Sequence, residues 1–200
     1  MAFLPSLPEA PHLSDVITRF PKHWAPLMTF HDILLRGPSP FTIGERELIA
    51  AYVSGLNACH FCHGAHAVYA EAFGIDGAVF DALLADLDSA GVDARLKPVL
   101  AFARKLTLDQ ARMTPADAQA ILDAGWPEEA VNDVTMVTAT FNFMNRVIHG
   151  HGVAPNPELL AARRQAMVAG KSPAERQAAN DTELGSRTYT DFGRELGILD

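Results

Sequence analysis

The segment from Cys59 to His66 (CHFCHGAH) contains both cysteines of the chain and three histidines. On a helix, Cys59, Cys62 and His66 share one face because they are three and four residues apart. The nucleophile in thiol chemistry is the thiolate, and its pKa falls at a helix N-terminus or beside an imidazole. The first effect acts chiefly on Cys59 and the second on Cys62. The spacing therefore predicts a redox-active pair but leaves the attacking thiol open.

Two other interpretations fit the same residues. Both cysteines could be small buried hydrophobic side chains, since free cysteine is among the most buried residue types. They could also bind zinc together with His63 or His66, with His149 or His151 as a fourth ligand. Structural zinc sites usually take their paired cysteines from a turn, whereas these lie on one continuous helix. Redox chemistry requires nothing beyond the pair and His66.

The residues between these positions have different expected roles. His63 is expected beside Cys59 at the edge of the reactive face, while His60 is expected to point away and to lie at the surface. Phe61, between the cysteines, is expected to pack into the core.

The preceding helix offers two carboxylates for a proton relay, Glu45 and Glu47. Glu45 is already explained by a capping box with Thr42, in which each side chain bonds the other's backbone amide. Glu47 shares a face with the small side chains of Ala50, Ala51 and Ser54, which let the next helix approach closely. We expect Glu47 to be partly desolvated, with a raised pKa, although an exposed Glu47 fits the sequence equally well.

The elements that position these residues are predicted to be helices, because no segment alternates apolar and polar residues over five or more positions. The predicted helices cover residues 14–35 (interrupted at Pro21 and Pro26), 43–56, 59–73, 77–86, 94–108, a segment from 115 onward, 128–149 and 158–169. The helix over 128–149 is apolar almost all round, which predicts a buried central helix. Its polar stripe is interpreted as a solvent or subunit face: Asn132, Thr135, Asn142, Arg146 and His149.

Composition narrows the classes of function. The chain has 200 residues, is 48% hydrophobic and carries a net charge of −8, from 16 Lys and Arg against 24 Asp and Glu. This fits one domain with one core. No basic run suits nucleic acid, and no apolar stretch reaches membrane-spanning length. We expect a soluble cytoplasmic protein that binds neither nucleic acid nor membranes, and in a reducing compartment a close cysteine pair indicates redox or metal chemistry.

Glu47, followed twelve residues later by Cys59-x-x-Cys62-x-x-x-His66, resembles the core motif of the AhpD-like alkylhydroperoxidases in the carboxymuconolactone decarboxylase superfamily. The segment 141–146 (FNFMNR) resembles a later part of the longer members known as uncharacterised peroxidase-related enzymes. The resemblance covers roughly residues 27–157. It implies an all-α AhpD-like helical bundle as a single domain, over residues 1–170. Residues 171–200 would form a tail that packs on the domain or on a neighbouring subunit, and protomers would associate as trimers or hexamers.

The resemblance also implies roles for the site residues. Cys62 would be the peroxidatic thiol, Cys59 the resolving thiol, His66 the base that activates Cys62, and Glu47 the far end of a relay through water. The effect of the His66 imidazole on the thiol pKa would then be larger than that of the helix N-terminus. The implied substrate is a small-molecule hydroperoxide, the reductant is an unidentified dithiol or protein, and no cofactor or metal is required. The alternative is a non-catalytic helical oligomer whose Cys/His cluster binds a metal such as zinc.

One position departs from the family pattern. The best-characterised AhpD proteins have a histidine immediately before the second cysteine, where this chain has Phe61. Part of their proton network is therefore missing here, or His63 replaces it. Decarboxylating members of the superfamily generally lack the cysteine pair, so lactone decarboxylation is a poor fit.

Overall fold

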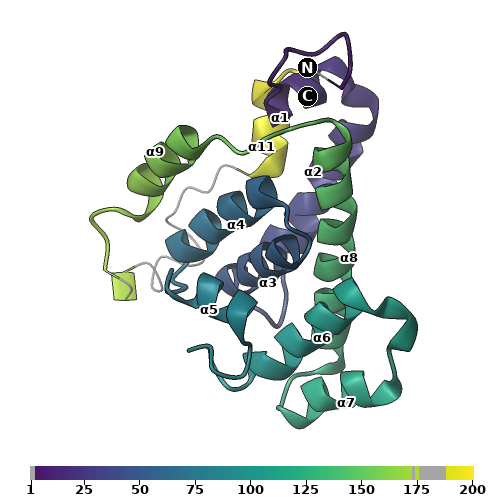
Figure 1. Ribbon diagram of the computed structural model, residues 1–200, viewed down its shortest axis with the longest axis vertical. Coiled ribbons are helices and arrows are strands. Elements are labelled where there is room, and N and C mark those ends of the chain that lie inside the picture. Colours follow the sequence, from purple (N-terminus) through teal and green to yellow (C-terminus); the bar gives the residue numbers. More distant parts are fainter. Residues whose placement is uncertain (1–2, 173, 176–187) are drawn as a thin grey trace.

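The computed structural model describes residues 3–172, 174–175 and 188–200, and Figure 1 shows their arrangement. The described residues form a single all-helical domain without strands, which confirms the predicted fold class. Within the same residues, no helix combines the length and apolar character that a membrane span requires. The part of the predicted tail over residues 176–187 lies outside the described residues.

The first predicted helix is two helices, α1 (Leu13–Arg19) and α2 (Pro21–Arg36). The break falls at Phe20, and Pro21 occupies the first turn of α2, where the missing amide hydrogen costs nothing. Pro26 lies inside α2 and does not end it. At the C-terminus of α2, the Arg46 guanidinium donates to the carbonyl oxygens of Leu34 (3.0 Å) and Gly37 (2.8 Å). This fixes the end of α2 against the next helix.

The centre of the fold is α3 (Ile43–Leu56), whose residues are buried almost continuously as far as Ser54. Its N-terminus has the predicted capping box: the Thr42 amide donates to Glu45 (2.8 Å), and the Glu45 amide donates to the Thr42 hydroxyl (3.2 Å). Helix α4 (His60–Ala72) packs along α3, as Figure 1 shows. The approach is close at Gly44, where an added Cβ would lie 2.8 Å from the carbonyl oxygen of Phe73.

The remaining helices enclose this pair. They are α5 (Val79–Ala85), α6 (Leu96–Leu108), the 3₁₀ turn η1 (Gln110–Arg112), α7 (Pro115–Asp123) and α8 (Glu128–Gly150). The prediction of a buried central helix over 128–149 is wrong for part of the helix. Met136 is 38% and Phe143 is 51% exposed on α8, because only one face of this helix packs on α3 and α6. The almost fully buried helix is α3.

Two C-terminal helices cover the α2 and α4 side of the molecule. Helix α9 (Pro157–Val168) lies on α4, where Leu160 contacts Gly64 and Arg164 forms a 2.8 Å ion pair with Glu71. Helix α11 (Tyr189–Glu195) lies beside α2 (Figure 1). The Asp32 carboxylate on α2 accepts hydrogen bonds from the first amides of α11, at 2.6 Å from Tyr189 and 2.9 Å from Thr190. The end of the chain therefore packs on its own domain, while the proposed domain boundary at residue 170 stays a prediction.

Candidate functional site

The two cysteines lie at the start of α4. Cys59 is the residue that precedes its first turn, and Cys62 lies within that turn. The pair approaches to 3.4 Å, and both thiols are free and buried. The preceding residue, Ala58, has φ = 53°, a left-handed conformation that a residue with a Cβ rarely adopts. The α3–α4 joint therefore accepts local strain at the point where it delivers Cys59 to the helix N-terminus.

The two thiols share one ionisation, and its charge is favoured on Cys59. A hydrogen bond from the Cys62 thiol, opposed by burial, lowers the pKa of Cys59 to about 6, with help from the Cys62 amide, His149 and Asn145. The same hydrogen bond, together with burial, raises the pKa of Cys62. The division follows chiefly from the hydrogen bond between the two thiols and does not involve His66, so the roles that the resemblance implies for Cys59 and Cys62 stay a prediction. Cys62 holds its proton toward the Cys59 sulfur.

A cavity of about 160 Å³ opens beside this pair and is lined mainly by apolar side chains. Cys62 and His66 both line it, whereas Cys59 does not and has no exposed surface. The walls come from the start of α1 and from α2, α4, α8, α9 and α11. A small molecule in this cavity would therefore meet the Cys62 sulfur first, with Cys59 directly behind it.

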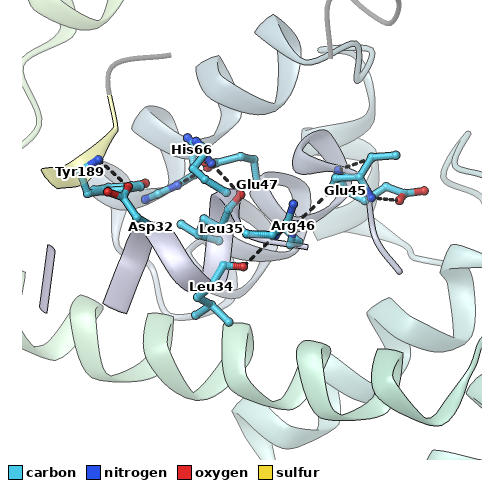
Figure 2. Close-up of polar contacts among 11 residues, drawn as sticks. Asp32, Leu34, Leu35, Glu45, Arg46, Glu47, His66 and Tyr189 are labelled. Atoms are coloured by element: carbon cyan, nitrogen blue, oxygen red, sulfur yellow. Dashed lines mark hydrogen bonds and ion pairs between the residues drawn. The ribbon is translucent and has the colours of Figure 1, made fainter. Parts of the chain in front are cut away.

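His66 is held by Glu47, which is fully buried on α3. The His66 Nδ1 lies 2.5 Å from Glu47 Oε2, and the Arg36 guanidinium lies 2.5 Å from Glu47 Oε1. Figure 2 shows His66 and Glu47 directed toward one another, with Tyr189 and Asp32 to one side. A carboxylate can only accept, so Nδ1 carries the hydrogen and the other ring nitrogen, Nε2, is available as a base. Within the part of the chain that the structure describes, no hydrogen bond joins His66 to Cys62.

The predicted raised pKa of Glu47 is wrong. Burial does raise the pKa, but the charges and hydrogen bonds of Arg36 and His66 outweigh it and lower the pKa to about 2. Glu47 therefore stays ionised at neutral pH. It is suited to orient His66 and to stabilise an imidazolium, and poorly suited to receive the proton at the end of a relay.

The Glu47 carboxylate makes folding stability depend on pH. A carboxyl whose folded-state pKa is lowered contributes stability above its unfolded-state pKa, and this contribution is lost as the pH falls through the folded-state value. We expect Glu47 to lose a contribution of about 3 kcal/mol as the pH falls from the ordinary value of 4.5 to about 2. Urea unfolding of the wild type and Glu47→Gln over this range checks it. Equal acid losses in both proteins would contradict the assignment.

The other sequence candidates lie in different places. His60 is exposed and lies at the cavity. Phe61 is half-buried: it packs against the core, as predicted, and it also lines the cavity. His63 is turned away from the cavity: its Nδ1 donates to the Ala51 carbonyl oxygen at 2.9 Å, and its ring packs edge-on against Phe80. His63 therefore does not stand in for the histidine missing at position 61.

The zinc interpretation finds no support in the arrangement of side chains. Among the described residues, no group of three or more His, Cys, Asp or Glu side chains converges in a way that could hold a metal ion. Of the suggested fourth ligands, His149 is exposed, and the Nδ1 of His151 donates to the carbonyl oxygen of Val147 at 2.7 Å.

Sequence reasoning missed three residues of the site. Arg36 was not among the sequence candidates, yet it neutralises Glu47 from a position eleven residues earlier. His31, also on α2, lines the cavity. Asn145, on α8, is 1% exposed and donates to the Ser54 hydroxyl at 3.0 Å. Its place in the FNFMNR segment was the one available signal, and no local pattern pointed to Arg36 or His31.

The fold and the site together define an all-helical protein with a buried CxxC pair, an oriented histidine and an apolar cavity. Two solved structures are similar to it. One is an uncharacterized peroxidase-related protein from Ralstonia eutropha JMP134, described as an alkylhydroperoxidase AhpD core. It is 27% identical, with a TM-score of 0.69 over 75% of this chain and 79% of the other.

The second is an uncharacterized peroxidase-related protein from Silicibacter sp. TM1040, 31% identical, with a TM-score of 0.61 over 68% of this chain and 70% of the other. No family model matches the chain, and no curated protein does so. The sequence identity and the coverage of these two structures are sufficient to assign the chain to a superfamily. It belongs to the AhpD-like superfamily, as its motif suggested.

Proposed function

We propose that the protein is a thiol-dependent hydroperoxide reductase, in which Cys62 is the peroxidatic thiol and Cys59 the resolving thiol. One observation carries the proposal: of two buried thiols 3.4 Å apart, only Cys62 lines the cavity that also contains His66. Both structural relatives are described as peroxidase-related proteins, and one of them as an alkylhydroperoxidase AhpD core, which supports this class of reaction.

The chemistry balances with the residues present. Cys62 loses its proton to Nε2 of His66 or to the Cys59 thiolate, and its sulfur attacks the terminal oxygen of the hydroperoxide. The O–O bond breaks, the leaving alkoxide takes a proton, and an alcohol and a sulfenic acid on Cys62 result. The Cys59 thiol then attacks this sulfur, forming the Cys59–Cys62 disulfide and releasing water. A dithiol or a protein reductant must supply two electrons to restore the thiols.

The walls of the cavity favour an organic hydroperoxide. Apolar side chains surround the Cys62 sulfur from several directions: Leu13, Trp24, Met28, Phe61, Phe141, Met144, Ile148, Leu159 and Phe192. Burial of an alkyl or aryl group against them contributes about 25 cal/mol per Å² of apolar surface, whereas hydrogen peroxide has no such surface.

Turnover with a chemical dithiol tests the proposal. With excess dithiothreitol, the protein is expected to convert cumene hydroperoxide to 2-phenyl-2-propanol in equimolar amounts, and a metal chelator is expected to change neither the rate nor the number of titratable thiols. Chromatography of the alcohol and thiol titration measure both. A rate equal to that of the protein-free control would contradict the proposed activity. A rate abolished by chelator would favour the metal-binding alternative.

We also propose that the protein forms a homo-oligomer and works in a reducing compartment such as the cytoplasm. Large apolar side chains that are at least one-third exposed support the first statement: Ile33 on α2, and Met136 and Phe143 on α8. The presence of only two cysteines, three residues apart, supports the second, because it does not suit a secreted disulfide framework.

A further inference from the structure

His31 is a second buried imidazole in the cavity that contains Cys62. It lies on α2, is 5% exposed and lines the cavity together with Cys62 and His66. Its Nδ1 lies 2.8 Å from the carbonyl oxygen of Leu27. A carbonyl oxygen can only accept, so Nδ1 must carry a hydrogen. In the neutral ring, Nε2 is therefore an acceptor with a free lone pair.

The surroundings of His31 keep the ring neutral. Burial and the nearby His66 lower its pKa, and the hydrogen bond to Leu27 and the carboxylates of Glu47 and Asp32 only partly offset this. Its ring packs edge-on against Phe141 and obliquely against Tyr189. Within residues 3–172, 174–175 and 188–200, no hydrogen bond to its Nε2 occurs. The acceptor is therefore available to a molecule bound in the cavity.

The two imidazoles of the cavity are complementary. Both pack edge-on against Phe141, with ring centroids 6.3 Å away for His31 and 4.4 Å away for His66. Both direct Nδ1 to a fixed protein acceptor. When His66 takes the proton of the Cys62 thiol, its Nε2 is not free to accept a hydrogen bond from the substrate. The terminal O–H is the one hydrogen-bond donor of an alkyl hydroperoxide, and it needs an acceptor in a cavity whose walls are mainly apolar.

We propose that Nε2 of His31 accepts a hydrogen bond from the terminal O–H of the hydroperoxide and thereby positions that oxygen for attack by Cys62. This inference rests on the proposed function and deepens it. It also gives the site a second histidine, His31 on α2, whereas position 61, where the family pattern has a histidine, is a phenylalanine in this chain. His31 takes no proton in this scheme: the terminal oxygen keeps its hydrogen and becomes the sulfenic acid.

His31→Phe tests the proposal, because it retains a flat ring and removes the acceptor. We expect the second-order rate of disulfide formation with cumene hydroperoxide to fall about 10- to 100-fold, as for the loss of a buried hydrogen bond. Modification of Cys62 by methyl methanethiosulfonate, which has no hydrogen-bond donor, should be unchanged. His63→Phe is the matched control, since His63 also donates to a backbone carbonyl but does not line the cavity.

Binding of the product alcohol tests the acceptor without turnover. Trp24 lines the cavity, and its fluorescence can report binding of 2-phenyl-2-propanol and of the methyl ether of this alcohol, which has no donor. The wild type and His63→Phe are expected to bind the alcohol more tightly than the ether. In His31→Phe, the ratio of the two affinities is expected to fall about 10-fold. His31→Gln, which can offer an amide oxygen, should retain part of the preference for the alcohol. If His31→Phe does not fold, as checked by circular dichroism, the smaller His31→Leu takes its place.

The outcomes separate the two proposals. An unchanged alcohol preference and an unchanged peroxide rate in the His31 variant would overturn the role of His31 while leaving the reductase intact. Equal losses in the His31 and His63 variants would also overturn it, since the effect would then be structural. A third outcome is that the wild type does not reduce hydroperoxides but prefers the alcohol, and that His31→Phe lacks this preference. In that case the proposed function fails and the binding role of His31 stands.

Discussion

Cys62→Ser is expected to abolish reduction of organic hydroperoxides, and Cys59→Ser is expected to stop the reaction at a sulfenic acid on Cys62. The reason is access: the cavity reaches the Cys62 sulfur and not that of Cys59, which is fully buried. Serine is a far weaker nucleophile at neutral pH. Without the thiol of Cys59, the sulfenic acid has no nearby partner with which to condense.

Trapping with dimedone followed by peptide mass spectrometry locates the oxidised sulfur in each variant. The lowered pKa of Cys59 makes this a sharp test, since a choice made by charge alone would favour Cys59 as the attacking thiol. If the trapped sulfenic acid appears on Cys59 in Cys62→Ser and Cys62 is inert in Cys59→Ser, then the assignment is reversed.

Glu47→Gln is expected to slow modification of Cys62 at neutral pH by about 10²-fold to 10⁴-fold, the range for a lost acid–base function. Glutamine cannot stabilise a protonated His66, and its amide can hold the ring in the wrong tautomer. The difference from the wild type should narrow as the pH rises, because hydroxide then competes with the imidazole for the Cys62 proton. Iodoacetamide alkylation of Cys62 from about pH 5 to about pH 10 measures the effect, and profiles parallel to the wild type would remove Glu47 from the site.

A double variant separates this role from stability. Glu47→Gln alone leaves the buried Arg36 guanidinium without its counter-charge, which costs about 3–5 kcal/mol. Arg36→Met combined with Glu47→Gln removes both charges and should recover much of that stability. The alkylation rate should stay low in the double variant, because His66 still lacks its carboxylate. Recovery of rate together with stability would show that Glu47 acts only on folding.

Much of the fold could be predicted because local signals agreed with the tertiary packing. Thr42 and Glu45 form the capping box that the sequence indicated, and the helix that carries Cys62 lies where its spacing required. The prediction for α8 was wrong because periodicity cannot show which apolar side chains find a partner. Phe143 is one that does not, at 51% exposed. Nothing in the polar sequence around Tyr189 indicated that Asp32 would bind the N-terminus of α11.

The candidate site could be predicted where its geometry is local and not where it depends on contacts between helices. The shared face of Cys59 and Cys62 follows from helical spacing. The charge state of Glu47 does not, because it depends on Arg36, which reaches it from another helix. The same holds for His31, whose role depends on a cavity assembled from six helices.

Cycling of the buried pair between dithiol and disulfide can be observed by intact-protein and peptide mass spectrometry of the wild type. One equivalent of cumene hydroperoxide is added to the fully reduced protein in the presence of chelator. We expect the loss of both free thiols, the loss of two hydrogens from the intact mass, and a peptide that contains an internal Cys59–Cys62 disulfide. Two thiols that remain free while the hydroperoxide persists would contradict the proposed cycle.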